Sequence, residues 1–151
     1  MLAQKNFMKQ KYIDAHIKVA NVYAELSTAE RLQVGCVIVK DNTIIGIGYN
    51  GMPSGWDNVC ENTHTVFPGT KITKSKPEVL HAETNAIAKV SRSNNSTENA
   101  DLFVTHAPCL ECAKLIYQSG IKSVYYRDTY RSEDGIKFLQ KCNVEVKQVG
   151  K

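Results

Sequence analysis

The 151-residue sequence has no apolar run near the ~20 residues that a membrane-crossing helix needs. Its first residues, MLAQKNFMKQK, contain no apolar stretch of the signal-peptide type. Prolines and glycines are too few for a collagen-like chain, and the 42% hydrophobic content is too high for a disordered one. We therefore expect a globular protein of the cytoplasm, or of the host cytoplasm if the source is a virus, with no membrane partner.

Cysteine is sparse and odd in number, which argues against a disulfide framework. The five cysteines are Cys36, Cys60, Cys109, Cys112 and Cys142. In a reducing compartment such residues serve as metal ligands, nucleophiles or core residues. Cys36 and Cys142 are expected in the core.

Strong charge of one sign is also missing. The net charge is +4, and the basic residues are spread along the chain apart from Lys71, Lys74 and Lys76, which we expect in a solvated loop. Proteins that bind polynucleotides usually show a basic stripe or a pI above ~9. The mild excess of positive charge suits a phosphate-bearing small molecule as partner, and no nucleic-acid partner is expected.

Hydrophobic periodicity predicts the first three elements. Ile13, Ile17, Ala20 and Ala24 recur at helical spacing. Residues 33–40 and 43–49 are β-branched apolar runs, and the Asp41-Asn42 pair between them tolerates the left-handed backbone of a tight turn. An N-terminal helix followed by a β-hairpin is expected.

Helical and strand patterns alternate in the second half of the chain. The expected helices are 82–91, 109–119 and 132–141, and the expected strands are 101–105, 122–126 and 144–149. Such alternation indicates parallel strands joined by crossovers and covered by helices. The predicted fold class is α/β, with three layers and a five-stranded mixed sheet flanked by helices. Residues 50–76 are expected to lack regular structure, as a functional loop or a disordered segment.

Three residues of the types that zinc prefers lie at two predicted helix starts. His81 begins the motif HAE, while Cys109 and Cys112 belong to the motif PCLEC. Two cysteines spaced in this way at a loop-to-helix turn can direct both sulfurs to one point. A structural zinc normally has four protein ligands, whereas a catalytic zinc keeps one position for water. Three ligands therefore favour a catalytic ion.

Glu83 lies in the first turn of the helix after His81. Residues two apart inside a helix point to different faces, so the two can share a pocket only because His81 lies at the helix boundary. A carboxylate there can move a proton from water to a ring nitrogen and then to a leaving amine. H-x-E with a later P-C-x-x-C resembles the signature of zinc deaminases that act on nucleobases, which implies hydrolytic deamination.

Other interpretations of these residues stay open. The CxxC motif alone is compatible with a redox pair. Cys60 and His64 could form a second metal site, or complete the zinc site of a binding module that is not an enzyme. In that module the metal would have no open position.

A longer set of motifs indicates one family among the zinc deaminases. GIGYNGMPSGWDN spans residues 46–58, QVGCVIV precedes it, and HAETNAI and APCLECAKLIYQSGIKSVYY follow it. With these motifs the chain closely resembles the deoxycytidylate (dCMP) deaminase family from about Arg31 to Tyr130. The resemblance implies the cytidine-deaminase-like α/β/α fold, in one domain over residues 1–151. It also implies conversion of dCMP to dUMP and ammonia, which supplies dUMP for dTMP synthesis.

The resemblance assigns expected roles to individual residues. One zinc ion per chain would be held by His81, Cys109 and Cys112, with Glu83 as the catalytic proton carrier. The substrate-binding positions match Asn50, Tyr130, Arg131 and Arg31. Asn50 is expected at the sugar hydroxyl, and the other three are expected at the base and the phosphate.

Regulation is implied by the same resemblance. dCTP with Mg²⁺ would activate, dTTP would inhibit, and the assembly would be a homohexamer. The residues expected at the effector nucleotide are Gly48, Tyr49, Gly51, Met52, Gly55 and Asp57. The glycines would let the backbone approach a triphosphate, and Asp57 would reach the magnesium ion.

Two positions depart from the family pattern. Asn58 stands where a second aspartate often occurs, and Ala29 stands where some relatives have a cysteine for a structural zinc. Because the zinc motifs alone are shared by several deaminases, free (deoxy)cytidine, or cytosine or adenine in a polynucleotide, remain alternative substrates.

Overall fold

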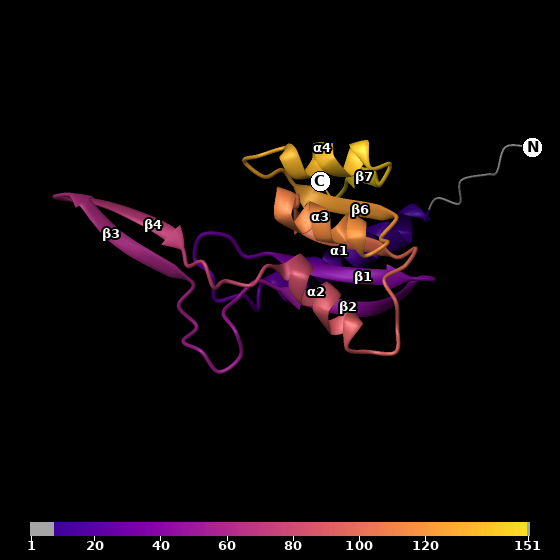
Figure 1. Ribbon diagram of the computed structural model, residues 1–151, viewed down its shortest axis with the longest axis horizontal. Helices are drawn as coiled ribbons and strands as arrows, with labels where there is room; N and C mark the ends of the chain where they lie inside the picture. Colours follow the sequence, from indigo (N-terminus) through magenta and orange to yellow (C-terminus); the bar gives the residue numbers. More distant parts are fainter. Residues whose placement is uncertain (1–7, 151) are drawn as a thin grey trace, which may run out of the picture.

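A computed structural model describes residues 8–150, which are arranged around a five-stranded sheet (Figure 1). The strands are β1 (Gly35–Lys40), β2 (Thr43–Tyr49), β5 (Asp101–His106), β6 (Ser123–Asp128) and β7 (Glu145–Gln148). Their order across the sheet is β2-β1-β5-β6-β7. β1 is antiparallel to β2 and β5, whereas β5, β6 and β7 are parallel. The predicted mixed sheet is confirmed.

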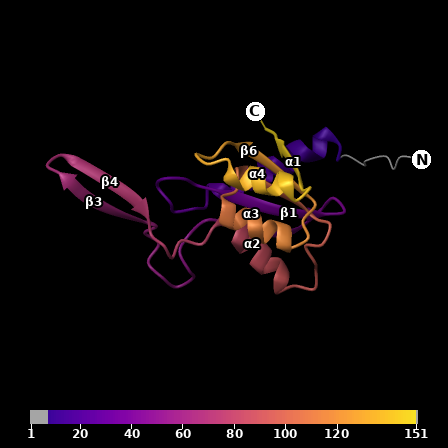
Figure 2. The ribbon, with the colours of Figure 1, turned by 45° about the horizontal axis from the view of Figure 1, so that its top comes forward.

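Helices cover both faces of this sheet (Figure 2). They are α1 (Gln10–Ala24), α2 (Ala82–Ser91), α3 (Leu110–Gln118) and α4 (Asp134–Lys141). Alternate residues of each strand face opposite sides. Val37 and Phe103 pack with α1, while Cys36 and Leu102 pack with the other three helices. The predicted three-layer α/β architecture is confirmed, and Cys36 is a core residue.

The turn between β1 and β2 follows the prediction from its sequence. Asp41 and Asn42 have φ values of 50° and 60°, and Lys40 pairs directly with Thr43. Two left-handed residues match the twist of the flanking strands. The turn therefore sets the pairing next to it, and an irregularity between Ile38 and Val39 shifts the register of the rest of the two strands.

Glycines bring helices into direct contact with neighbouring backbone. An added Cβ on Gly48, in β2, would overlap the carbonyl oxygen of Ala82 and lie 2.6 Å from the backbone nitrogen of Ala86 in α2. An added Cβ on Gly135, in α4, would overlap the carbonyl oxygen of Pro108 and lie 2.9 Å from that of Cys109. The starts of α2 and α3, where the expected zinc ligands His81 and Cys109 lie, are thus each in close contact with a glycine.

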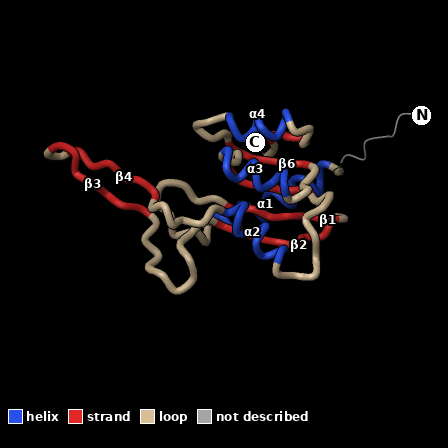
Figure 3. Tube along the Cα trace, viewed as in Figure 1, coloured by secondary structure: helices blue, strands red, loops and turns tan. Residues whose placement is uncertain are grey.

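The prediction that residues 50–76 lack regular structure is wrong in part. β3 (Glu61–Phe67) and β4 (Thr70–Ser75) form an antiparallel hairpin that extends away from the sheet (Figures 1 and 3). Its threonines and β-branched residues favour strands. Pro68 and Gly69 connect the strands, and the φ of +84° at Gly69 is the left-handed value that a type II turn needs.

Nearly all side chains of this hairpin are exposed, with Glu61 as the buried exception. Lys71 and Lys74 lie on β4 rather than in a loop. Within residues 8–150, none of the helices has the length and apolar composition required to span a bilayer. Residues 1–7, part of the segment in which no signal sequence is expected, lie outside the described residues.

Candidate active site

His81 is placed by the start of α2. It is the N-cap residue, with an extended backbone (φ −77°, ψ 152°), and its carbonyl oxygen accepts hydrogen bonds from the hydroxyl of Thr84 and the N–H of Asn85. Because His81 precedes the helical turn, its ring and the side chain of Glu83 both reach the same cavity. The predicted shared pocket is therefore present.

Cys109 is placed in the same way by the start of α3. β5 leads into Ala107, whose N–H donates to the carbonyl oxygen of Asp128 at 2.8 Å, and Pro108 then turns the chain. Cys109 is the N-cap of the helix, and Cys112 follows in its first turn, 1% exposed. Free N–H groups at a helix start favour thiolates.

These elements bring the three predicted ligands together. The Nδ1 atom of His81 lies 3.2 Å from Sγ of Cys112 and 3.7 Å from Sγ of Cys109. Two atoms bound to one zinc ion at about 2.0–2.3 Å lie at most about 4.6 Å apart. One imidazole nitrogen and two sulfurs at these separations fit a Zn²⁺ ion, for which this is a preferred donor set.

Burial and mutual contacts shift the ionisation of the cluster. Burial raises the pKa of Glu83 to about 7, although the charge of His81 opposes this shift. A hydrogen bond from Cys112, then one from His81, lowers the pKa of Cys109 to about 4. The same contact with Cys109 raises the pKa of Cys112, because it retains the proton that the two sulfurs share. Of the two sulfurs, Cys109 therefore gives up its proton more readily.

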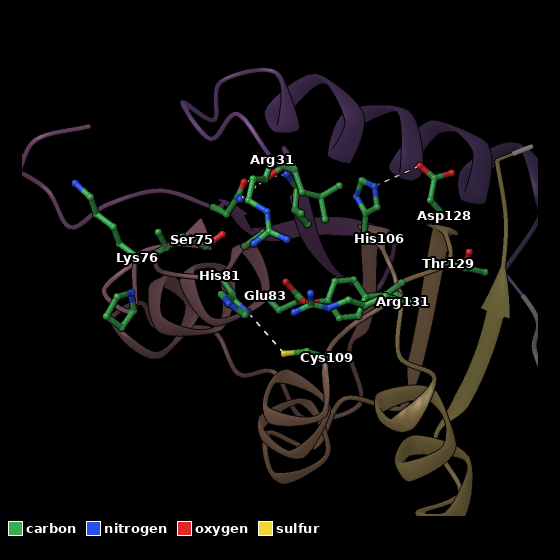
Figure 4. Close-up of a pocket in the computed structure, with 18 residues that line it drawn as sticks. Arg31, Ser75, Lys76, His81, Glu83, His106, Cys109, Asp128, Thr129 and Arg131 are labelled. Carbon is green, nitrogen blue, oxygen red and sulfur yellow. Dashed lines mark hydrogen bonds and ion pairs between the residues drawn. The ribbon is translucent and has the colours of Figure 1, made fainter. Parts of the chain in front are cut away.

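The cluster opens into a cavity of about 530 Å³ at the carboxyl ends of β5 and β6. The cavity is also lined by four residues assigned above to the substrate: Arg31, Asn50, Tyr130 and Arg131. In Figure 4 the Arg31 and Arg131 side chains enter from different segments, one before β1 and one after β6, and both point toward the middle of the site. Such a cavity can hold a ligand with a compact anionic group.

Asn50 also holds two segments of backbone together, a role that the sequence did not predict. Its Nδ2 donates to the carbonyl oxygen of Leu32 at 2.7 Å, and its Oδ1 accepts from the N–H of Val34 at 2.9 Å. Each end of the amide keeps one further hydrogen-bonding position. Asn50 therefore joins β2 to the segment before β1 while it lines the cavity.

Several residues that line the cavity have no role predicted from the sequence. His106 and Asp128 end β5 and β6, with His106 Nε2 3.6 Å from Asp128 Oδ2. Burial lowers the pKa of His106. Their positions at the carboxyl ends of parallel strands are a signal that could have identified them. Ser75 and Lys76, at the foot of β4, gave no signal because the hairpin itself was not predicted.

The six residues expected at the effector nucleotide all lie within the described part of the chain, and none lines this cavity. Gly48 lies in β2, as the strand predicted over residues 43–49 implies. It is buried, and its missing side chain makes room for α2 rather than for a nucleotide. Tyr49 ends the same strand. Gly55 is exposed with a φ of +85°, and the Asp57 carboxylate accepts a hydrogen bond from the N–H of Val59.

The suggested pairing of Cys60 with His64 is not supported. Within residues 8–150, the cluster of three metal-type donors contains neither residue. Cys60 is buried, with its sulfur 3.6 Å from the Thr28 hydroxyl, whereas His64 is exposed on β3. Cys142 is half-buried and packs against the core.

The three-layer fold and the His–Cys–Cys cluster beside a buried carboxylate define a zinc-binding α/β protein. Residues 8–128 match the family described as the cytidine and deoxycytidylate deaminase zinc-binding region. The chain belongs to this family. The predicted zinc cofactor and cytidine-deaminase-like fold are thereby confirmed.

Individual relatives agree with this assignment. The chain is 37% identical over 132 residues to ComE operon protein 2 of Bacillus subtilis (strain 168), covering 86% of this chain and 67% of that one. It is 38% identical over 125 residues to deoxycytidylate deaminase of Homo sapiens, covering 77% of this chain and 65% of that one. The chain thus spans about two thirds of the length of these curated relatives.

A solved structure gives a fuller match. The crystal structure of dCMP deaminase from the cyanophage S-TIM5 in complex with dCMP and dUMP has a TM-score of 0.84 and 40% sequence identity. The similarity covers 95% of this chain and 100% of that chain. The whole arrangement of sheet and helices is therefore shared with a dCMP deaminase.

Proposed function

We propose that this chain is a zinc-dependent dCMP deaminase, which converts dCMP and water into dUMP and ammonia, in a single domain over residues 1–151. The observation that carries the proposal is Glu83, a carboxyl group 5% exposed, beside a His–Cys–Cys cluster in a cavity that also contains two arginines. Relatives named deoxycytidylate deaminase, and a matched structure bound to dCMP and dUMP, support it.

Each part of the site has a role in this reaction. A zinc ion held by His81, Cys109 and Cys112 would activate a water molecule. Glu83 carries protons: because burial places its pKa near 7, it can both accept a proton and donate one at neutral pH. The water oxygen adds to the ring carbon that carries the amino group, and Glu83 passes the proton of this water to the ring nitrogen. A second proton passes to the amino group, the carbon–nitrogen bond breaks, and ammonia leaves.

Substrate binding uses the residues around the cluster. Arg31 and Arg131 bind the phosphate, since guanidinium groups form paired, charge-assisted hydrogen bonds with phosphate oxygens. Asn50 contacts the sugar hydroxyl with the hydrogen-bonding positions that its backbone contacts leave open. Tyr130, with Arg131 Cζ 5.5 Å from its ring centroid, closes over the base.

Regulation and assembly are part of the proposal. dCTP with Mg²⁺ activates and dTTP inhibits through Tyr49, Gly51, Met52, Gly55 and Asp57, in a homohexamer. An added Cβ on Gly51 or Gly55 meets nothing within 4 Å, so the backbone there is open to a ligand. We place the protein in a reducing compartment such as the cytoplasm, where cysteines stay available as metal ligands.

Replacement of Glu83 tests the proposed function. Glu83→Gln should retain zinc, measured by elemental analysis, and lose turnover of dCMP, measured as cytosine absorbance and ammonia release. Glu111→Gln is the matched control, because Glu111 is exposed in the first turn of α3 and pairs with Lys114. Substantial turnover in Glu83→Gln would contradict the role of Glu83.

The same assay decides between substrate classes. The proposal requires the wild-type chain to release ammonia from dCMP faster than from deoxycytidine or single-stranded DNA or RNA. Faster release from one of these would identify a nucleoside or polynucleotide deaminase instead. Addition of dCTP with Mg²⁺, or of dTTP, tests the regulatory part.

A further inference from the structure

The segment that carries Arg31 has no regular structure of its own. It joins α1 to β1 over residues 25–34, and the side chains of Glu30 and Arg31 are exposed. Arg31 nevertheless lines the cavity and points into it (Figure 4). The position of this arginine must therefore be fixed by contacts that the segment makes with other parts of the chain.

Glu61, the first residue of β3, supplies two of these contacts. Its Oε1 atom accepts hydrogen bonds from the backbone N–H groups of Glu30 at 2.8 Å and Arg31 at 3.2 Å. Its side chain is 7% exposed, although the rest of β3 is exposed. A buried carboxylate is costly unless it is hydrogen-bonded, so this side chain favours the arrangement in which both N–H groups face it.

A second clamp lies beside the first. The Thr28 hydroxyl donates to the carbonyl oxygen of Asn58 at 2.7 Å, three residues before Glu61. The root of the hairpin and the Arg31 segment are thus joined at two points. Glu61 itself does not line the cavity.

We infer that Glu61 is a positioning residue for phosphate specificity: it holds the backbone from which Arg31 reaches the substrate phosphate. This inference rests on the proposed function. Without the Glu61 carboxylate, water can satisfy the N–H groups of Glu30 and Arg31, and the segment samples other positions. The phosphate contact is then weakened, while the cluster and its proton carrier stay in place.

The test measures binding in the zinc-loaded Glu83→Gln protein, in which turnover does not interfere. Dissociation constants for dCMP and for deoxycytidine are determined by calorimetry. Glu61→Ala should weaken dCMP binding by about tenfold or more, the loss expected for a charge-assisted hydrogen bond. Binding of deoxycytidine, which has no phosphate, should change by less than about twofold.

Three further variants separate positioning from general damage. Glu61→Gln keeps an oxygen acceptor at the same place and should restore most of the affinity. Thr63→Ala, on the same strand, with an exposed hydroxyl 3.4 Å from that of Thr73, should bind dCMP like the parent protein. In an Arg31→Ala background, Glu61→Ala should cause little further loss, because the group that it positions is gone.

Three results would overturn the inference: unchanged dCMP binding in Glu61→Ala, equal weakening of dCMP and deoxycytidine, or full additivity with Arg31→Ala. Its failure can be told apart from failure of the proposed function. The latter is judged by ammonia release from dCMP by the wild-type chain, and the former by the ratio of the two dissociation constants.

Discussion

Substitution of Gly135 by alanine should weaken both the fold and the zinc site. The added methyl group would overlap the carbonyl oxygen of Pro108 and lie 2.9 Å from that of Cys109. Both atoms belong to backbone that carries a zinc ligand, so neither can move without displacing the Cys109 sulfur. The perturbation therefore acts on a contact between α4 and the start of α3.

The magnitude follows from two opposing effects. Overpacking against backbone costs up to about 3 kcal/mol, while alanine gains about 1 kcal/mol over glycine inside a helix. The net loss of about 2 kcal/mol should lower Tm by about 4–8 °C for a chain of this length. Because supporting residues affect metal affinity by about 10–100-fold, zinc binding should weaken within this range.

Thermal unfolding followed by circular dichroism, and zinc competition against a chromophoric chelator, measure the two effects. Gly51→Ala is the matched control, since its added Cβ meets nothing within 4 Å and its φ is not in the left-handed region. A Gly135→Ala protein with the wild-type Tm and zinc affinity would refute this reasoning about the contact.

Three other outcomes are expected. Arg131→Ala should raise KM about tenfold or more for dCMP but less than about twofold for deoxycytidine, in steady-state absorbance assays; equal effects would remove Arg131 from the phosphate site. Removal of zinc by a chelator should abolish turnover and lower Tm, and Zn²⁺ but not Mg²⁺ should restore both; activity in zinc-free protein would contradict the assigned cofactor. Burial raises the pKa of Asp101 despite the nearby Lys122. The ionised form therefore costs stability in the folded state, and wild-type stability falls as pH rises from the unfolded pKa of ~3.9 through the higher folded one. Asp101→Asn should accordingly be more stable than wild type in urea at neutral pH, with the advantage shrinking toward pH 3; an advantage that grows in acid would contradict this sign.

The sheet and the zinc ligands could be predicted because their signals are local. The Asp41-Asn42 turn makes β1 and β2 antiparallel neighbours and sets the pairs next to it through its own backbone. His81 and Cys109 each lie at a helix start, where a ligand can be recognised from its neighbours in the sequence. Contacts within a few residues carry this information.

The features that could not be predicted from the sequence depend on contacts between distant segments of the chain. Most residues of β3 and β4 are polar, so these strands lack the alternation of apolar and polar residues that would distinguish them from a loop. The burial of Glu61 arises from N–H groups about thirty residues earlier in the chain. Gly48 packs against backbone atoms of Ala82 and Ala86, which come much later in the chain, so its packing role is visible only in the folded structure. Such roles are set by tertiary structure.

The two-stranded hairpin gives the molecule two separate levels of local stability. An isolated pair of strands without a packed face is marginally stable in water. Backbone amides of Thr63 and Thr73 should therefore exchange their hydrogens rapidly, through local opening of the hairpin. Those of Phe103 and Val104, in the core, should exchange only when the whole protein unfolds. A thermal melting curve would consequently report the unfolding of the five-stranded sheet and its helices. The β3–β4 hairpin would have a separate, lower free energy of opening.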